Sequence, residues 1–297
     1  MKKVIITGGS GFLGSKLSEV LINEGFSVVS LDFVPPKNPN VLFLKADLSK
    51  SIPKDDILKE PLAIINLAGA NIGVKWTPKY KESIYNSRIL TTKNVVSLMS
   101  DSDFHPKVFI SASAVGVYGD RGDEILDESS EIKENQGFLA KVAKDWETEA
   151  KNAENHGVRT VILRQGHILG MGSIVQTLLP YYKWGIGGPI GSGNQYFPWI
   201  HIEDLVNLYI YLIKNDFSGT INAVSGEPIT NKEFSKVFAR VLKRPHFLFI
   251  PIFVLKIKFG EFTNEVVKSQ RVVSSKIDKN FIFKFTSLKK ALENIFS

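Results

Sequence analysis

The chain has 297 residues, 43% hydrophobic and 23% charged, which is the composition of a folded globular protein of one large or two modest domains. It contains no cysteine, which excludes disulfide bonds, thiolate metal sites and cysteine nucleophiles. The net charge is +7, but from Pro228 onward there are 14 Lys and Arg against 5 Asp and Glu. This basic region favours either an anionic ligand or a solvated lysine-rich surface, and its lysines are too dispersed to predict nucleic-acid binding.

No targeting or membrane-spanning segment is predicted. Only Val4–Ile6 separate the basic start from the glycines that follow, so no signal peptide is expected. The longest apolar run, Phe247–Leu255, contains Pro251 and is too short to cross a bilayer. We therefore expect a soluble cytoplasmic protein without a membrane partner, either a monomer or a homodimer.

The first half of the chain alternates β-branched segments with helical patterns, which is typical of a parallel sheet wound with helices. The pattern predicts strands at residues 4–7, 27–32, 41–45, 63–67, 108–111 and 160–164, and helices at 11–24, 81–99 and 138–153. Glycine-rich loops over 185–193 precede a helix at 202–214, a strand at 220–223, and helices at 231–242 and 288–295. Because the strands are nearly all apolar, both faces of the sheet should be covered.

These elements predict an α/β fold, a Rossmann-type doubly wound parallel sheet with a smaller, mostly helical C-terminal substrate lobe. The sheet domain is expected over residues 1–165, with 201–227 returning to it, and the glycine-rich turn described next predicts that this domain binds a dinucleotide. The lobe is expected over 166–200 and 228–297.

A glycine-rich turn joins the first strand to the first helix. Gly8, Gly11 and Gly14 follow a GxxGxxG spacing, which lets backbone N–H groups approach a pyrophosphate at a helix N-terminus. Asp32 ends the second strand, 18 positions after Gly14, where a carboxylate binds the ribose hydroxyls of NAD and repels the 2′-phosphate of NADP. The nearby Lys37 leaves NADP open.

Further cofactor contacts are expected where the next strands end, since such sheets bind ligands at their carboxyl edge. The residues predicted to contact the dinucleotide are Gly8, Ser10, Gly11, Phe12, Leu13, Gly14, Asp32, Asp47, Leu48, Leu67, Ala68, Gly69, Arg88 and Ser111.

Four segments resemble the extended short-chain dehydrogenase/reductase superfamily, in its NAD-dependent epimerase/dehydratase branch: residues 7–14 (TGGSGFLG), 65–73 (INLAGANIG), 110–119 (ISASAVGVYG) and 163–170 (LRQGHILG). Segments 76–92, 138–147, 187–205 and 222–234 are similar to an atypical group of this branch, called epimerase family proteins. The group carries a small C-terminal domain of unknown function, which residues 246–295 resemble.

The resemblance implies a catalytic Ser/Thr followed by Tyr-x-x-x-Lys, and this chain departs from that pattern. Ser113 matches the serine, but no tyrosine lies between Tyr118 and Tyr181. The matching helix carries Phe138 and Val142 in place of the tyrosine and lysine, a loss the atypical group shares. Arg88 replaces the superfamily's asparagine.

Other groups are therefore candidates for acid–base chemistry. The candidate catalytic residues are Ser113, Tyr118 and Lys141, with Lys144 as an alternative lysine, and the candidate substrate contacts are Trp199, His201 and His167. Each also has a structural interpretation: the lysines as a solvated helix face, the aromatic and histidine side chains as packed residues, and Arg88 as an ion-pair partner. No metal-ligand set, nucleophile elbow or Walker A motif is present.

Two functions remain open. The first is an NAD(P)-dependent oxidoreductase or epimerase that acts on a small polar or anionic substrate through non-standard acid–base residues. The second is a catalytically inactive dinucleotide-binding sensor or regulator.

Overall fold

The computed structural model describes residues 2–277 and 280–297, and within them seven parallel strands form one sheet. The strand order is β10-β7-β5-β4-β1-β2-β3. The strands are β1 (Lys3–Thr7), β2 (Ser27–Asp32), β3 (Leu42–Lys45), β4 (Ala63–Asn66), β5 (Val108–Ala114), β7 (Arg159–Gln165) and β10 (Gly219–Ala223). In the centre, Val4 of β1 lies opposite Val28 of β2 on one side and Ala63 of β4 on the other. The chain reverses its direction of winding at β1. In open α/β sheets, ligands generally bind at the carboxyl ends of the strands beside such a reversal.

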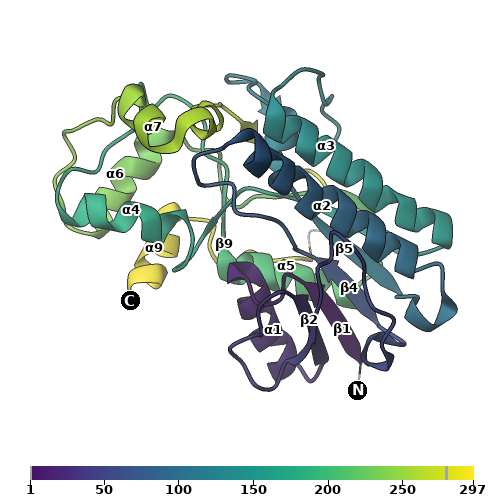
Figure 1. The fold of residues 1–297 in the computed structure, drawn as a ribbon. Helices are drawn as coiled ribbons and strands as arrows, with labels where there is room; N and C mark the ends of the chain where they lie inside the picture. Colours follow the sequence, from purple (N-terminus) through teal and green to yellow (C-terminus); the bar gives the residue numbers. More distant parts are fainter. Residues whose placement is uncertain (1, 278–279) are drawn as a thin grey trace.

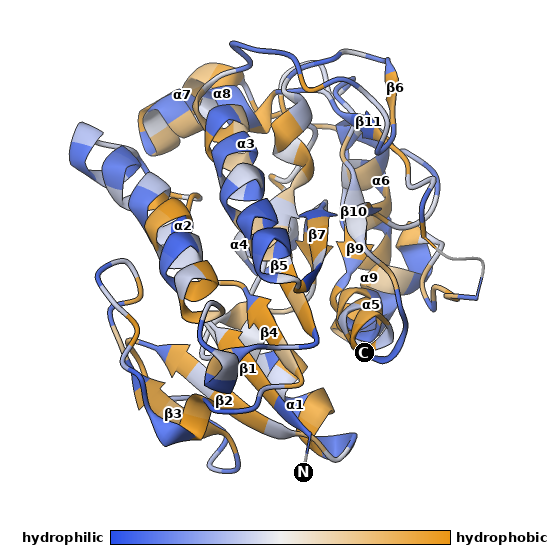
Figure 2. Ribbon diagram, turned by 90° about the vertical axis from the view of Figure 1, so that its right-hand side faces the viewer, coloured by the Kyte–Doolittle hydropathy of each residue, from blue (hydrophilic) through white to orange (hydrophobic). Residues whose placement is uncertain are grey.

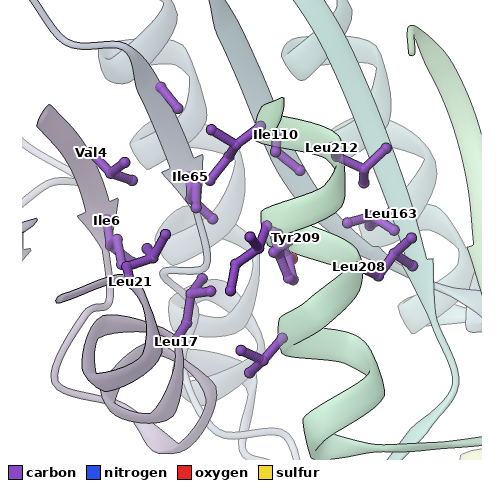
Figure 3. Packing of buried hydrophobic residues seen from close by; sticks show 14 of the residues in the cluster. Val4, Ile6, Leu17, Leu21, Ile65, Ile110, Leu163, Leu208, Tyr209 and Leu212 are labelled. Atoms are coloured by element: carbon purple, nitrogen blue, oxygen red, sulfur yellow. The ribbon is translucent and has the colours of Figure 1, made fainter. Parts of the chain in front are cut away.

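Helices cover both faces of the sheet (Figure 1). They are α1 (Phe12–Asn23), α2 (Pro78–Leu98), α3 (Phe138–Lys151) and α5 (Ile202–Lys214). Val4 and Ile6 point towards α1 and α5, whereas Ile5 between them packs with residues of α2 and α3. Figure 3 shows Tyr209 of α5 among the side chains of the first of these faces. Successive side chains of β1 thus point to opposite faces, and helices cover both. This explains why the strand is apolar at each position from Val4 to Ile6, because a strand that is covered on both faces buries the side chains on both.

A smaller lobe stands beside the sheet, on the left of Figure 1. Its helices are α4 (Ile174–Lys183), α6 (Asn231–Val241), α7 (Ile252–Phe259), α8 (Thr263–Val266) and α9 (Leu288–Phe296). Two short parallel pairs join β8 (His167–Leu169) to β9 (Trp199–His201), and β6 (Ile125–Leu126) to β11 (Arg271–Val272). The 3₁₀ turns are η1 (Asp56–Leu58), η2 (Ser102–Phe104), η3 (Val115–Tyr118), η4 (Asn152–His156) and η5 (Gly260–Phe262).

The buried carboxylate of Asp204 fastens the C-terminal segment to α5. Its two oxygens accept hydrogen bonds from the backbone N–H groups of Lys284 (2.7 Å) and Phe285 (3.0 Å). Ser225 donates its hydroxyl to the Phe285 carbonyl at 2.5 Å. Phe285 then joins Phe234 of α6 and Leu292 of α9 in a core separate from those of the sheet.

The predicted fold class is confirmed, and most differences lie at the ends of elements. Helix α2 begins at Pro78 rather than at residue 81, because the Thr77 side chain caps it by accepting from the Tyr80 N–H at 3.1 Å. Helices α4 and α7 were not predicted. Pro180, a residue that disfavours helix, lies inside the first, and the second lacks a polar face. Residues 219–223 pair with β7 in the sheet, although the boundaries between sheet and lobe remain a prediction. Within the described ranges, no helix is long and apolar enough to span a bilayer.

Candidate functional site

The backbone of the first turn requires glycine at two of its three spaced glycine positions, Gly8 and Gly14. Gly8 has a φ of +71°, which a residue with a side chain rarely adopts. A Cβ on Gly14 would lie 2.3 Å from the Gly8 carbonyl oxygen, so any larger residue would force the turn away from the helix. At Gly11 a Cβ would meet only this same oxygen, at 3.2 Å, and the residue is exposed.

The N-terminus of α1 is open. Gly11 is the N-cap residue and offers no side-chain cap, and the first turn contains no acidic residue. Backbone N–H groups in the first turn of a helix have no intrahelical acceptor, and the helix dipole adds partial positive charge there. This cradle fits the pyrophosphate of a dinucleotide.

Asp32 lies beside the glycine turn. One of its carboxylate oxygens accepts from the Ser10 N–H at 3.1 Å, and the other accepts from the Phe33 N–H at 2.7 Å. The carboxylate therefore orders the turn and adds a negative charge where the second strand ends. A 2′-phosphate at this edge would have to approach that charge.

A buried network holds the carboxyl ends of β1, β4 and β5 together. Asn66 accepts from the Thr7 hydroxyl at 2.7 Å and donates to the Thr92 hydroxyl at 2.7 Å. Its amide also donates to Ser111 at 3.3 Å, and Trp146 of α3 donates to Thr92 at 2.9 Å. Ser111 is thus part of the scaffold beneath the site. Such fully bonded networks fix strand ends in one position.

Arg88 of α2 is a partly buried cation, and it forms no ion pair with a carboxylate among the described residues. Its guanidinium donates to the carbonyl oxygens of Ala70 (3.2 Å) and Ile84 (3.1 Å), and a Cβ on Gly69 would lie 2.8 Å from it. Burial lowers the pKa of Arg88 to about 10, which leaves it charged at neutral pH. The ion-pair alternative is thus not observed, and the positive charge lies against the loop after β4.

Ser113 is bonded within a buried ion pair. Its hydroxyl donates to Glu147 Oε1 at 2.7 Å, and Arg164 forms a two-pronged bond with the same carboxylate, at 2.8 Å for each contact. Burial alone would lower the pKa of Arg164, but its bonds to Glu147 raise it above the ordinary value. Ala114 is the only exposed residue of β5, and because it has no hydroxyl, no hydroxyl of this strand is exposed.

Tyr118 belongs to the same network. Its hydroxyl accepts from Arg164 at 2.9 Å and donates to Asn222 Oδ1 at 2.9 Å or to the Asp127 carbonyl at 2.8 Å. Burial raises the pKa of Tyr118, and the adjacent Arg164 opposes this. The side chain is completely buried, which favours the structural interpretation.

An aromatic cluster occupies the position where the superfamily has its tyrosine. The rings of Trp76 and Phe138 lie 5.4 Å apart, and Phe262 of η5 lies 5.6 Å from Trp76. Lys81 places its ammonium 4.6 Å above the Phe138 ring and forms an ion pair with Glu261 at 2.7 Å. The C-terminal segment therefore covers this position.

The two candidate lysines lie on an exposed face of α3. Lys141 forms an ion pair with Asp145, which raises the pKa of the lysine, and Lys144 pairs with Glu134. A base at neutral pH needs a lowered lysine pKa. The geometry thus agrees with the solvated-face interpretation.

The three candidate substrate contacts lie at β8 and β9. Trp199 and His201 are only 2% and 1% exposed, and neither Trp199 Nε1 nor His201 Nε2 has a hydrogen-bond partner among the described residues. Burial lowers the pKa of His201 to about 4, so the ring is neutral at pH 7, and its Nδ1 accepts from the Glu203 N–H at 3.2 Å to cap α5. His167 stacks on Phe197 with ring centres 4.1 Å apart.

Two other predicted contacts are tied into the fold. Asp47 accepts from the Ser49 hydroxyl at 2.7 Å, which lowers the pKa of the carboxyl. Leu48 is buried, and its carbonyl accepts from Asn94 at 2.8 Å. A cavity of about 400 Å³ lies elsewhere, between Asp120, Tyr196 and α7, and not at the glycine turn.

Sequence reasoning missed Glu147 and Arg164, although both carried a signal. Glu147 falls within the apolar stripe that Ala143 and Ala150 mark on α3. Arg164 interrupts an apolar strand. A charge within an apolar pattern indicates a buried partner, because an unpaired charge is costly to bury.

The sheet order and glycine turn define a Rossmann-type protein with a dinucleotide-binding turn. The chain belongs to the NAD dependent epimerase/dehydratase family, whose sequence profile matches residues 4–224, and a domain of unknown function, DUF1731, matches residues 250–295. It is 37% identical to the Epimerase family protein YfhF of Bacillus subtilis, over 98% of this chain and 97% of that protein. It is 34% identical to the chloroplastic SDR39U1 homolog of Arabidopsis thaliana, over 98% of this chain and 86% of that protein.

Solved structures agree with this family assignment. The human epimerase family protein SDR39U1 with NADPH superposes with a TM-score of 0.87 at 28% identity, over 99% of this chain and 98% of that chain. A UDP-glucose 4-epimerase of Thermotoga maritima shares the fold alone, with a TM-score of 0.79 at 18% identity, over 99% of this chain and 98% of that chain. The resemblance stated from the sequence is thus confirmed.

Proposed function

We propose that the chain binds a nicotinamide dinucleotide along the carboxyl edge of β1, β2 and β4 and transfers hydride between it and a small polar substrate. The uncapped N-terminus of α1 carries the proposal. It offers free backbone N–H donors, and a side chain at Gly14 would clash with the turn that holds these donors in place. Asp32 favours NAD, whereas the NADPH bound to the human relative favours NADP. A bound dinucleotide supplies or accepts the hydride.

Arg88 takes the place of the missing proton donor in this proposal. Its charge lies against Gly69, and no carboxylate among the described residues neutralises it. A fixed cation stabilises an oxyanion that develops on a substrate carbonyl, and water then supplies the proton. The same cation favours an anionic substrate, such as a carboxylate.

The test uses NADH or NADPH deuterated at C4 with a panel of carbonyl compounds, half of them carboxylates, and mass spectrometry of the products. Arg88→Met should lower label transfer far more than it lowers dinucleotide affinity, which Arg88 supports through the loop after β4, and Arg88→Lys should retain a fraction of the transfer. Equal transfer by the wild type and Arg88→Met would refute the role of Arg88.

A dinucleotide-binding regulator is the second candidate, and one observation favours it. The position of the usual tyrosine is filled by Phe138, packed against Trp76 and Phe262 of the C-terminal segment. Dinucleotide binding beside this cluster would alter how the segment packs. Hydrogen exchange over residues 259–266 that slows with NADPH, together with no label transfer to any compound, would support the regulator and contradict the enzyme.

A further inference from the structure

Helix α7 is apolar and nevertheless exposed. Of its eight residues, six are exposed and none is buried. Phe253 (65% exposed) and Ile257 (74%) stand four positions apart and so share one face, whereas Leu255 and Phe259 are partly covered. A helix this short is not stable in water by itself, and helices normally gain stability by burying an apolar face.

The exposed apolar surface extends beyond the helix. Nine of the sixteen large exposed hydrophobic residues in the described ranges fall within residues 184–186 and 247–257, here called the α7 patch. The two segments are neighbours, since Ile190 and Ile250 form a parallel bridge and the Gly191 N–H donates to the Ile250 carbonyl at 2.9 Å. Trp184 (82% exposed) and Phe247 (78%) extend it furthest. Figure 2 shows α7 as a largely hydrophobic helix at the outer edge of the molecule.

The charged residues of the two sequence segments that carry the patch are all positive. Residues 183–190 and 243–258 contain five Lys and Arg and no Asp or Glu. The acidic Asp120 and Asp123 line the cavity that Ile252 borders, and Ile252 is not on the face shared by Phe253 and Ile257. A two-fold contact between copies of this chain would bring like charges together. An anionic surface with an apolar interior would satisfy both the charges and the exposed rings.

We propose that the α7 patch docks the protein on the surface of an anionic phospholipid bilayer. Phe253, Ile257 and Trp184 enter the interface between headgroups and acyl chains, where aromatic rings are favoured. Lys256 and the neighbouring cations remain at the level of the lipid phosphates. A helix that lies on a membrane surface does not need the length of a bilayer-spanning segment. The lack of a predicted spanning segment therefore does not exclude docking of α7 on a membrane surface.

Trp184 provides a local probe, because the other three tryptophans are buried: Trp76, Trp146 and Trp199. The full-length protein is mixed with vesicles of phosphatidylcholine alone or with about 30 mol% phosphatidylglycerol, and binding is followed by flotation and by Trp184 emission. We expect binding to the anionic vesicles only, with a blue shift and protection from acrylamide. Raising NaCl from about 0.05 M to about 0.5 M should weaken binding several-fold.

Two pairs of variants separate the patch from the rest of the surface. Phe253→Ser with Ile257→Ser should lower vesicle affinity by at least about 10-fold, because two apolar side chains are lost from the interface. Lys256→Glu should lower it several-fold. The controls are Ile282→Ser, which removes an exposed apolar side chain elsewhere, and Lys290→Glu, which reverses an exposed charge on α9. All variants should keep the wild-type unfolding temperature.

Three results would overturn the proposal. They are no flotation of the wild type with anionic vesicles, equal binding by the patch variants and their controls, and a dimer that dissociates when Phe253 and Ile257 are replaced while vesicles are not bound. The last result would assign the patch to a second copy of the chain.

Discussion

Replacing Gly11 by Asp should affect stability and dinucleotide binding in opposite directions. Gly11 is the N-cap residue of α1, with an extended backbone (φ −73°, ψ 179°) that aspartate adopts readily at this position. An Asp side chain caps the helix and its charge interacts favourably with the helix dipole, but that charge also occupies the site proposed for the pyrophosphate. Gly11→Asn is the matched control, since it has the same shape and meets the same Gly8 oxygen at 3.2 Å without the charge.

The magnitude follows from the charge alone. A carboxylate about 5 Å from a phosphate, at an effective dielectric constant of about 20, costs about 3 kcal/mol, which is roughly a 100-fold loss of affinity. The Asp variant should therefore bind NAD(P)H roughly 100-fold more weakly than the Asn variant in a fluorescence titration. In urea denaturation it should be the more stable of the two by about 0.3–1 kcal/mol. Equal affinities for the two variants would refute an anion site at the start of α1.

Three further predictions concern the surrounding residues. Asp32→Asn keeps the size of the side chain but loses the charge and one of the two acceptor oxygens, so the affinity for NADPH relative to NADH should rise about 10-fold. An unchanged ratio would show that Asp32 is not the selector. Glu147→Ala leaves Arg164 buried without its partner and should destabilise the fold by about 3–5 kcal/mol. Ser113→Ala should destabilise it by only about 1 kcal/mol and leave dinucleotide affinity unchanged. A larger loss of stability for Ser113→Ala than for Glu147→Ala would contradict the network. His201 has a pKa of about 4 in the folded protein, whereas in the unfolded chain the imidazole takes up a proton near pH 6.5. The contribution of His201 to the free energy of unfolding is therefore complete above about pH 6.5 and falls by about 3 kcal/mol as the pH drops towards 4. His201→Asn should remove this part of the pH dependence of urea stability while still capping α5, and an unchanged pH profile would contradict it.

Local residue patterns were sufficient for the sheet and for the glycine turn. The spacing of Gly8, Gly11 and Gly14 between a strand and a helix reflects contacts within a few residues, such as the approach of Gly14 to the Gly8 oxygen. Strand and helix periods likewise depend on which side of each element is covered. Helix α7 shows the limit of this rule, because a short apolar segment without a polar face has no period to detect.

The environments of the candidate catalytic groups were decided only by the tertiary structure. Ser113 and Glu147 are 34 positions apart in the chain, and Tyr118 and Asn222 are 104 apart, yet each pair shares a hydrogen bond. The sequence by itself determined that Phe138 cannot exchange a proton and that a dinucleotide-type turn is present. Whether a hydroxyl or an imidazole is available to a ligand depends on partners that the fold brings from distant segments. Burial and pairing are properties of those contacts, and residue type alone does not specify them.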